Sequence, residues 1–451
     1  MKKSALVCLL LMGTSAAVCA GEVKDAAPVV ATPAKTEIKA EAPAANAAST
    51  ASQFALFQQA MARVRMSYVR PVEESELIDG AIQGMLAGLD PHSSYLNAKS
   101  YSNSLTATRG QFGGIGLVME PDDGLIKVIT AKDGTPAAKA GIKTEDRIAA
   151  IDGASVDGTD FNEAIDKMRG AVGSSITLTI LREGDKKPFD VTMVRTIVSV
   201  DAVTWRREGD IAYVRVPGFN EKTAQGFEKA MLELKKEIGP ALKGYVLDLR
   251  NNPGGLVDQA VRVCDDLLDS GEIVSIRGRS ADNIQRYSAK PGDLTEGKPI
   301  VVLINAGSAS ASEIVSGALQ DNKRATIVGM TSFGKGSVQT NIPLGVGLGA
   351  LHLTTGRYFT PSGHSIQAQG IIPDIQVAQG DETDSIKKKE ADLRRHLTGD
   401  AAAERADAPV IKAAPGKTYE DFQLSYAEDV LRGKGAVASA AVSRSGKPAV
   451  Q

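Results

Sequence analysis

Hydroxyl and amine side chains stand at two places where an apolar strand is expected to end in a glycine-rich turn. Residues 305–313, NAGSASASE, follow one such strand and open an expected helix. A hydroxyl at this position would lie beside unpaired backbone N–H groups and the positive end of the helix dipole, which stabilise a developing oxyanion. Residues 331–339, TSFGKGSVQ, follow the next strand and place a lysine between two glycines. Together the two segments can supply a nucleophile and a general base.

A third segment, residues 245–255 with the sequence YVLDLRNNPGG, also runs from an apolar strand into glycines. Glycines at the end of a buried strand allow the backbone to direct N–H groups into a cleft. Each segment alone has an ordinary explanation. Ser310 and Glu313 fit a helix capping box, Lys335 fits an exposed lysine, and the paired glycines fit a turn. The serial order of the three segments is what indicates a catalytic site.

This order resembles the carboxy-terminal processing (tail-specific) peptidases, a family of Ser/Lys serine proteases with an embedded PDZ domain. The resemblance covers about residues 54–377. It implies that Ser310 is the nucleophile and that Lys335 is the general base. It also implies that Gln339, four residues beyond the lysine, belongs to the catalytic set.

The resemblance further implies an oxyanion hole made by the backbone N–H groups of Gly255 and Ala311. Ala306 stands where the family often has glycine, a departure that should not affect the chemistry. Ser308 and Ser312 are the alternative hydroxyls. We expect Ser308 to precede the turn and Ser312 to lie inside the helix.

Lys335 can act as a base only when its amine is neutral. Burial would have to lower its pKa from about 10.4 to ~7–8, a shift of roughly 3 units or about 4 kcal/mol. The flanking glycines allow close backbone packing, and Gln339 can orient the amine. Ser310 would then attack a peptide carbonyl and form an acyl-enzyme that water hydrolyses.

Histidine and metal chemistry are not expected. None of the four histidines stands in a known triad order, and the sequence has no Gly-x-Ser-x-Gly elbow. There is no His-Glu-x-x-His motif and no cluster of metal ligands, so we predict neither a metal nor a cofactor. The histidines are His92, His352, His364 and His396.

Residues 110–182 resemble a PDZ domain, because a glycine-rich loop, a short helix, a strand with a turn and a later helix follow in PDZ order. Successive N–H groups of the loop can bind a C-terminal carboxylate, and the adjoining strand edge can accept a peptide by β-augmentation. Ala164 is expected on the apolar side of the groove. The predicted peptide-binding residues are Gly113, Gly114, Ile115, Gly116, Leu117, Phe161, Ile165 and Met168.

The expected fold is multidomain α+β: a helical N-terminal cap, a β-rich PDZ-like domain and an α/β core. The resemblance implies that this core is of the crotonase/ClpP-like serine protease type. The predicted segments are a signal peptide at 1–20, a disordered Ala/Pro-rich linker at 21–50, a helical region at 51–98, a PDZ domain at 99–198, a peptidase core at 199–378, and a solvated, charged tail with one short helix at 379–451.

The N-terminus predicts export. Lys2 and Lys3 precede a short apolar run and small residues, the order of a secretory signal peptide, with cleavage after Ala20. A lipoprotein would use Cys19, although Val18 before it fits such processing poorly. After cleavage only Cys264 remains, at an apolar helical spacing that indicates a buried structural thiol.

The resulting prediction is a periplasmic serine endopeptidase that cleaves proteins near their C-termini. The net charge of −2 gives no general attraction to nucleic acid or anionic membranes. Expected partners are protein substrates with accessible apolar C-termini, an adaptor or activator protein, and further copies of the chain. The alternatives are a catalytically silent PDZ scaffold and a trypsin-like PDZ protease, and the latter would need a Gly-Asn-Ser-Gly-Gly motif that is absent.

Overall fold

The computed structural model describes residues 47–122, 124–159, 161–185, 187–199, 202–280, 282–379, 388–399, 409–414 and 419–434. The predicted signal peptide and residues 21–46 of the predicted linker lie outside this range. The chain divides into two units between Pro71 and Val72. In the first unit, helix α1 (Ala47–Ser67) begins within the predicted linker, because alanine favours helix. In the described residues no helix is long and apolar enough to cross a membrane.

The second unit begins with helices and one strand. Helix α2 (Glu74–Ala87) leads through a turn into strand β1 (Ser94–Leu96), and Asn97 caps helix α3 (Ala98–Thr108) by accepting a hydrogen bond from the Ser100 N–H. Strand β1 pairs antiparallel with strand β18 (Ala350–Phe359) of the predicted peptidase core. The segment predicted as a helical cap therefore also supplies a strand to the core.

The expected PDZ domain is an antiparallel sheet in the order β3-β4-β5-β7-β8, with β6 paired to β5 and a separate β2–β9 pair. Its own apolar core includes Val128, Ile148 and Leu178. The elements are β2 (Gln111–Gly114), β3 (Leu117–Asp122), β4 (Leu125–Ala131), α4 (Pro136–Lys139), β5 (Arg147–Ile151), β6 (Ala154–Ser155), α5 (Phe161–Met168), β7 (Ser175–Leu181), β8 (Phe189–Val194) and β9 (Thr196–Ser199).

The predicted peptidase core is built on a six-stranded sheet in the order β10-β11-β12-β15-β16-β19, parallel except for the β10–β11 pair. Its central strands are buried on both faces, as parallel strands covered by helices are. The strands are β10 (Thr204–Glu208), β11 (Ile211–Arg215), β12 (Gly244–Asp248), β15 (Ile300–Ile304), β16 (Ala325–Gly329) and β19 (Ile375–Gln376).

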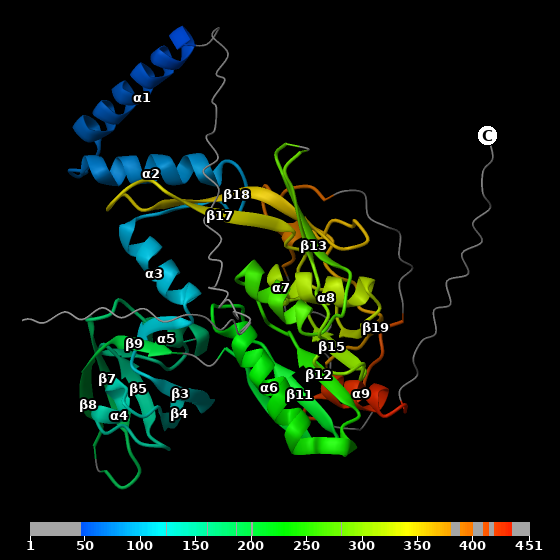
Figure 1. The fold of residues 1–451 in the computed structure, drawn as a ribbon. Coiled ribbons are helices and arrows are strands. Elements are labelled where there is room, and N and C mark those ends of the chain that lie inside the picture. The colour runs from blue at the N-terminus through cyan, green and yellow to red at the C-terminus, as the bar shows by residue number, and fades with distance from the viewer. Residues whose placement is uncertain are drawn as a thin grey trace, which may run out of the picture. The chain divides into compact units, whose positions relative to one another are not determined.

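Alternate side chains of these strands face two apolar clusters. One cluster joins the sheet to α6 (Thr223–Ile238), α7 (Val257–Asp265) and α8 (Ala311–Asp321), and the other joins it to α9 (Phe422–Leu431) (Figure 1). Cys264 is fully buried in the first cluster. A short 3-10 turn, η2 (Gly239–Ala241), follows α6. The parallel strands direct their carboxyl ends, and the turns after them, to one edge of the sheet.

A second, antiparallel sheet has the order β1-β18-β13-β14, and β17 pairs with the opposite edge of β18. Strand β17 begins two residues after Lys335, so the lysine turn connects the two sheets of the core. The remaining strands are β13 (Glu272–Gly278), β14 (Ile284–Ser288) and β17 (Ser337–Pro343).

The predicted tail after residue 379 contains the one short helix that was expected, but in the described residues this helix and Glu390 are packed against the rest of the fold and not solvated. Helix α9 packs on the large sheet through Leu424 and Ala427, and Asp421 accepts two hydrogen bonds from Arg250 at 2.9 and 2.7 Å. The 3-10 turn η3 (Glu390–Asp392) buries Glu390 completely. Because the surrounding sequence is charged, the apolar face of α9 and the buried carboxylate of Glu390 were not predicted.

Candidate active site

Ser310 is the residue that caps helix α8, directly after the turn that follows β15. Its φ of 55° lies in the left-handed region that non-glycine residues rarely adopt. The residue is 7% exposed. The phenol of Tyr358 faces it: burial raises the pKa of Tyr358, and a hydrogen bond with the Ser310 side chain acts in the opposite direction.

The two alternative hydroxyls have structural partners. The Ser308 hydroxyl donates to the Leu249 carbonyl at 2.7 Å, and the Ser312 hydroxyl donates to the Asn252 carbonyl at 2.8 Å. Both serines are fully buried. Their hydroxyls hold the helix start against the turn after β12, which leaves Ser310 as the hydroxyl of the three that is available for chemistry.

The paired glycines after β12 lie against the start of α8. A Cβ placed on Gly254, whose φ is +101°, would lie 2.8 Å from Ser310 Cβ and 3.0 Å from the Ala311 nitrogen. Within the described residues, neither the Gly255 N–H nor the Ala311 N–H donates a hydrogen bond. Two unpaired N–H groups of adjoining turns are the donor set that an oxyanion hole requires.

Asn252 fixes this junction, a role that the sequence did not indicate. Its side-chain amide donates to the Val216 carbonyl at 2.7 Å, and its side-chain oxygen accepts from the Gly254 N–H at 2.8 Å. Its own carbonyl accepts from the Ala309 N–H at 2.9 Å. Asn252 is fully buried, so these bonds are protected from water.

Glu313 links the serine turn to the lysine turn. Its Oε2 accepts from the Ser310 N–H at 2.8 Å and from the Lys335 N–H at 2.9 Å. Its Oε1 accepts from the Ser332 hydroxyl at 2.5 Å and from the Gly334 N–H at 2.7 Å. The side chain is 0% exposed, and burial raises its pKa to about 7 against these hydrogen bonds. The capping box that the sequence indicated therefore accounts for only part of the Glu313 bonds, and the others reach the turn that holds Lys335.

Lys335 lies in a turn that packs closely on residues 366–370. A Cβ on Gly336 would lie 2.3 Å from the Gln367 nitrogen, and one on Gly334 would lie 3.1 Å from the Gly370 nitrogen. Burial lowers the pKa of Lys335 below its ordinary value, whereas nearby carboxylates act in the opposite direction. A lowered pKa is what a lysine general base needs.

Gln339 has different partners from those we expected. Its side-chain amide donates to the Ser337 hydroxyl at 3.0 Å and to the Thr354 hydroxyl at 3.1 Å, and Thr354 donates to Asp90 at 3.0 Å. In the described residues no hydrogen bond joins Gln339 to the Lys335 amine, or that amine to the Ser310 hydroxyl. Catalytic hydrogen bonds often tighten only when substrate is bound.

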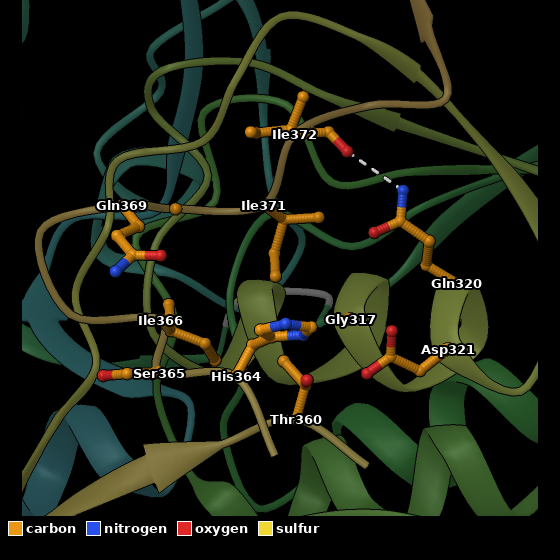
Figure 2. Close-up of a pocket in the computed structure, with 11 residues that line it drawn as sticks. Gly317, Gln320, Asp321, Thr360, His364, Ser365, Ile366, Gln369, Ile371 and Ile372 are labelled. Carbon is orange, nitrogen blue, oxygen red and sulfur yellow. Dashed lines mark hydrogen bonds between the residues drawn. The ribbon is translucent and has the colours of Figure 1, made fainter. Parts of the chain in front are cut away.

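The histidines take no part in hydrogen bonding to Ser310 within the described residues. His92 bonds Glu390, His352 bonds Asn341 at 2.6 Å, and His396 contacts the Leu393 carbonyl. His364 contacts the Ser362 hydroxyl at 2.8 Å. Its imidazole lines a cavity of about 70 Å³ between α8 and the 360–372 segment, which neither Ser310 nor Lys335 lines (Figure 2).

A groove of about 190 Å³ lies in the expected PDZ domain between the β2–β3 segment and helix α5. Of the predicted peptide-binding residues, Gly114, Ile115, Gly116, Leu117, Ile165 and Met168 line it, together with Phe112, Met119 and Arg169. The other predictions do not lie there. Gly113 faces the Gly170 carbonyl, and Phe161 and Ala164 pack into the domain core. Arg169 was missed because nothing in the helix sequence separates a groove arginine from a solvated one.

Three descriptions of known protein families match the chain. Peptidase family S41 matches residues 210–377, a PDZ domain matches residues 113–193, and the activating protease CtpB N-terminal domain matches residues 12–100. All the residues discussed above as nucleophile, base and oxyanion donors lie within the S41 match.

Proteins similar to the chain carry related names. The chain is 49% identical over 394 residues to a carboxy-terminal-processing protease of Bartonella bacilliformis, which covers 86% of this chain and 90% of that one. It is 36% identical over 335 residues to the carboxy-terminal processing protease CtpB of Bacillus subtilis, covering 72% and 68% of the two chains. A solved photosystem II D1 C-terminal processing protease is similar at 31% identity with a TM-score of 0.43, covering 72% of this chain and 93% of that one.

Proposed function

Because the chain belongs to the carboxy-terminal processing proteases of peptidase family S41 and is a serine-type peptidase with a PDZ domain, we propose that it cleaves proteins near their C-termini with Ser310 as nucleophile and Lys335 as general base. One observation carries this assignment. A single buried carboxylate, Glu313, accepts hydrogen bonds from the backbone of both residues.

The proposed reaction proceeds through an acyl-enzyme. Neutral Lys335 takes the proton of the Ser310 hydroxyl as its oxygen attacks the scissile carbonyl, and the N–H groups of Gly255 and Ala311 stabilise the oxyanion. The Lys335 ammonium then gives its proton to the departing amine, so the C-terminal fragment leaves as a neutral amine. Lys335 next takes a proton from water, whose oxygen attacks the Ser310 ester, and returns that proton to the Ser310 oxygen as the ester bond breaks and the new C-terminus is released.

The groove beside α5 is the proposed site for the substrate tail. Leu117, Ile165 and Met168 offer an apolar wall, and Arg169 adds a positive charge that suits a terminal carboxylate. A tail bound here can deliver the substrate to the peptidase or change the activity of its site. Deletion of residues 105–195 tests the second role: loss of cleavage of short peptides indicates that the domain is a required activator, and retained or raised cleavage indicates that it is a gate.

The periplasmic location, the adaptor protein and the homo-oligomer are proposed from the sequence alone. Lys2, Lys3 and the following apolar run support export to the periplasm, which is tested by fractionating cells that express the full chain and by sequencing the mature N-terminus. Cleavage after Ala20 is expected, whereas a chain that begins at Met1 in the cytoplasm would contradict export. An adaptor protein and a homo-oligomer also stay predictions.

The dyad is tested by purifying the wild type with Ser310→Ala, Lys335→Ala and Lys335→Arg variants. The substrate is a protein with an unstructured, apolar C-terminus. Arginine stays protonated at working pH, so Lys335→Arg should be as inactive as Lys335→Ala. Full activity of the arginine variant would contradict the neutral-base mechanism. A wild type that binds the tail without cutting it would favour the alternative of a silent PDZ scaffold.

A further inference from the structure

A carboxylate from beyond the S41 match reaches the lysine turn. Glu390, in η3, is 0% exposed. Its Oε2 lies 2.8 Å from His92 Nε2, and its Oε1 accepts from the Gln367 side-chain amide at 2.8 Å. Its backbone N–H donates to the Phe333 carbonyl at 3.1 Å. A buried carboxylate with this many partners has a structural or catalytic use, because burial of an unused charge is costly.

The contacts of Glu390 bracket Lys335 along the chain. Phe333, which accepts from the Glu390 backbone, lies two residues before the lysine. Gln367, which donates to the Glu390 side chain, accepts from the Gly336 N–H at 3.0 Å, one residue after the lysine. The backbone of Gly336 lies so close to Gln367 that there is no room for a side chain on residue 336. Displacing Glu390 would therefore disturb the turn on both sides of Lys335.

The charge of Glu390 also acts on the lysine. Burial works to raise the pKa of Glu390, but hydrogen bonds from His92 and Gln367 and the charge of Lys335 bring it below its ordinary value, so the carboxylate is ionised. In return, Glu390 raises the pKa of Lys335 against the effect of burial. The titratable groups around the lysine are Glu390 from η3, Glu313 from α8, Asp90 and His92 from the turn after α2, and His352 from β18.

We propose that Glu390 is a positioning residue for Lys335, and that the 388–399 segment, held by His92 and Gln367, belongs to the working active site. Loss of this segment or of its carboxylate would change the position of the Lys335 amine and the pH at which it loses its proton. The inference rests on the proposed role of Lys335 as general base.

The test is the pH profile of kcat/KM for Glu390→Gln in the full chain, on the same substrate protein. The rate rises with pH as Lys335 loses its proton. Removal of an opposite charge lowers the pKa of a lysine, so the acid limb should move to lower pH by about one unit. On that limb the variant would keep roughly a tenfold larger share of its own maximal rate than the wild type. Glu233→Gln, an exposed α6 carboxylate that pairs with Lys229, is the control and should leave the profile unchanged.

Two further variants separate charge from packing. Glu390→Asp keeps the charge, so its acid limb should stay with the wild type even where its maximal rate falls. His92→Gln leaves the Glu390 charge in place and keeps a side-chain amide that can donate to it, so its acid limb should also stay with the wild type. If Glu390→Gln does not fold, Glu390→Asp decides the question by its maximal rate, which should fall because the shorter side chain cannot keep both the His92 and the Gln367 contacts.

A Glu390→Gln profile that superimposes on the wild type, or a Glu390→Asp limb that moves as far as that of Glu390→Gln, would overturn the proposal. So would a Glu390→Asp maximal rate equal to that of the wild type, or a His92→Gln limb that moves as far as that of Glu390→Gln. If the proposed function itself is wrong, Ser310→Ala and Lys335→Ala will still cleave the substrate. If both of these variants are inactive but the Glu390→Gln limb does not move, only the role of Glu390 is rejected.

Discussion

The backbone N–H groups of Ser310 and Lys335 donate to the same oxygen atom, Oε2 of Glu313, at 2.8 and 2.9 Å. The two residues come from turns after different strands, β15 and β16. The shared acceptor therefore fixes the distance between these two turns, which the chain connectivity alone would not fix. Because Glu313 is fully buried, water cannot replace it as the acceptor.

Replacement of Glu313 by glutamine should lower kcat more than it changes KM. The amide keeps one oxygen, but its NH₂ group would face N–H donors that now point at a carboxylate oxygen. Misplacement of the dyad by such a change costs on the order of 10²-fold in rate. Steady-state kinetics on the substrate protein measure the effect, with the exposed Glu233→Gln as the matched control. Equal kcat in both variants would show that the link is dispensable.

Glu313 should also make the stability of the peptidase core depend on pH. Its pKa is raised from 4.5 to about 7 in the folded chain. A raised carboxyl pKa means that folding disfavours the charged form, so this contribution is full below about pH 4.5 and is lost as pH rises through about 7. The loss amounts to roughly 3 kcal/mol in the free energy of unfolding.

Trp205 gives the measurement, because it is the single tryptophan of the chain and packs against the peptidase core. Urea unfolding followed by its fluorescence should show the wild type losing stability relative to Glu313→Gln between pH 4.5 and pH 7.5. A difference between the two proteins that stays constant with pH would place the pKa of Glu313 outside this range.

A residue of this site could be predicted from the sequence only where its partners lie close to it along the chain. The family resemblance drawn from the three turn segments is confirmed by the matches to peptidase family S41 and its PDZ domain. Ser310 could not be separated from Ser308 and Ser312 by local pattern. In the structure the hydroxyls of Ser308 and Ser312 donate to carbonyls of the neighbouring strand turn, which the local pattern could not show.

Glu313 and Glu390 show the limit more clearly. The local pattern gave the first a cap, but its bonds to Ser332 and Gly334 come from a turn one strand further on. Glu390 ends a run of lysines, and such runs are usually solvated. Its partner His92 lies 298 positions earlier in the chain. Glu390 and His92 come together only in the folded chain, so the sequence did not identify either of them as part of the site.

Replacement of Gly254 by alanine should damage the proposed oxyanion hole. The new Cβ would lie 2.8 Å from both the Ala309 carbonyl oxygen and Ser310 Cβ, so the turn or the helix start must move. We expect kcat to fall by on the order of 10²-fold, the usual cost of losing an oxyanion donor. Gly239→Ala is the control, since its φ of +61° is equally left-handed but no atom lies within 4 Å of its Cβ position. A similar kcat for both variants would attribute any effect to backbone strain alone.

Replacement of Arg169 by glutamine should weaken binding of a peptide with a free, apolar C-terminus. Arg169 lines the groove of the PDZ domain, where its guanidinium also lies 5.1 Å from the Phe112 ring centroid. Loss of a charge-assisted hydrogen bond to a carboxylate costs about 1.5–3 kcal/mol, or roughly ten- to a hundredfold in Kd. Fluorescence anisotropy with a labelled peptide measures this in the full chain carrying Ser310→Ala, which prevents cleavage.

The matched control is Lys167→Gln, which removes an exposed charge that pairs with Glu163 on the same helix. Its Kd should stay within a factor of two of the parent protein. A peptide amidated at its C-terminus should bind the Arg169→Gln and parent proteins equally, because it has no carboxylate for the arginine to recognise. An equal loss of affinity for both peptides would instead assign Arg169 to the packing of Phe112, with carboxylate recognition left to the backbone N–H groups of residues 114–117.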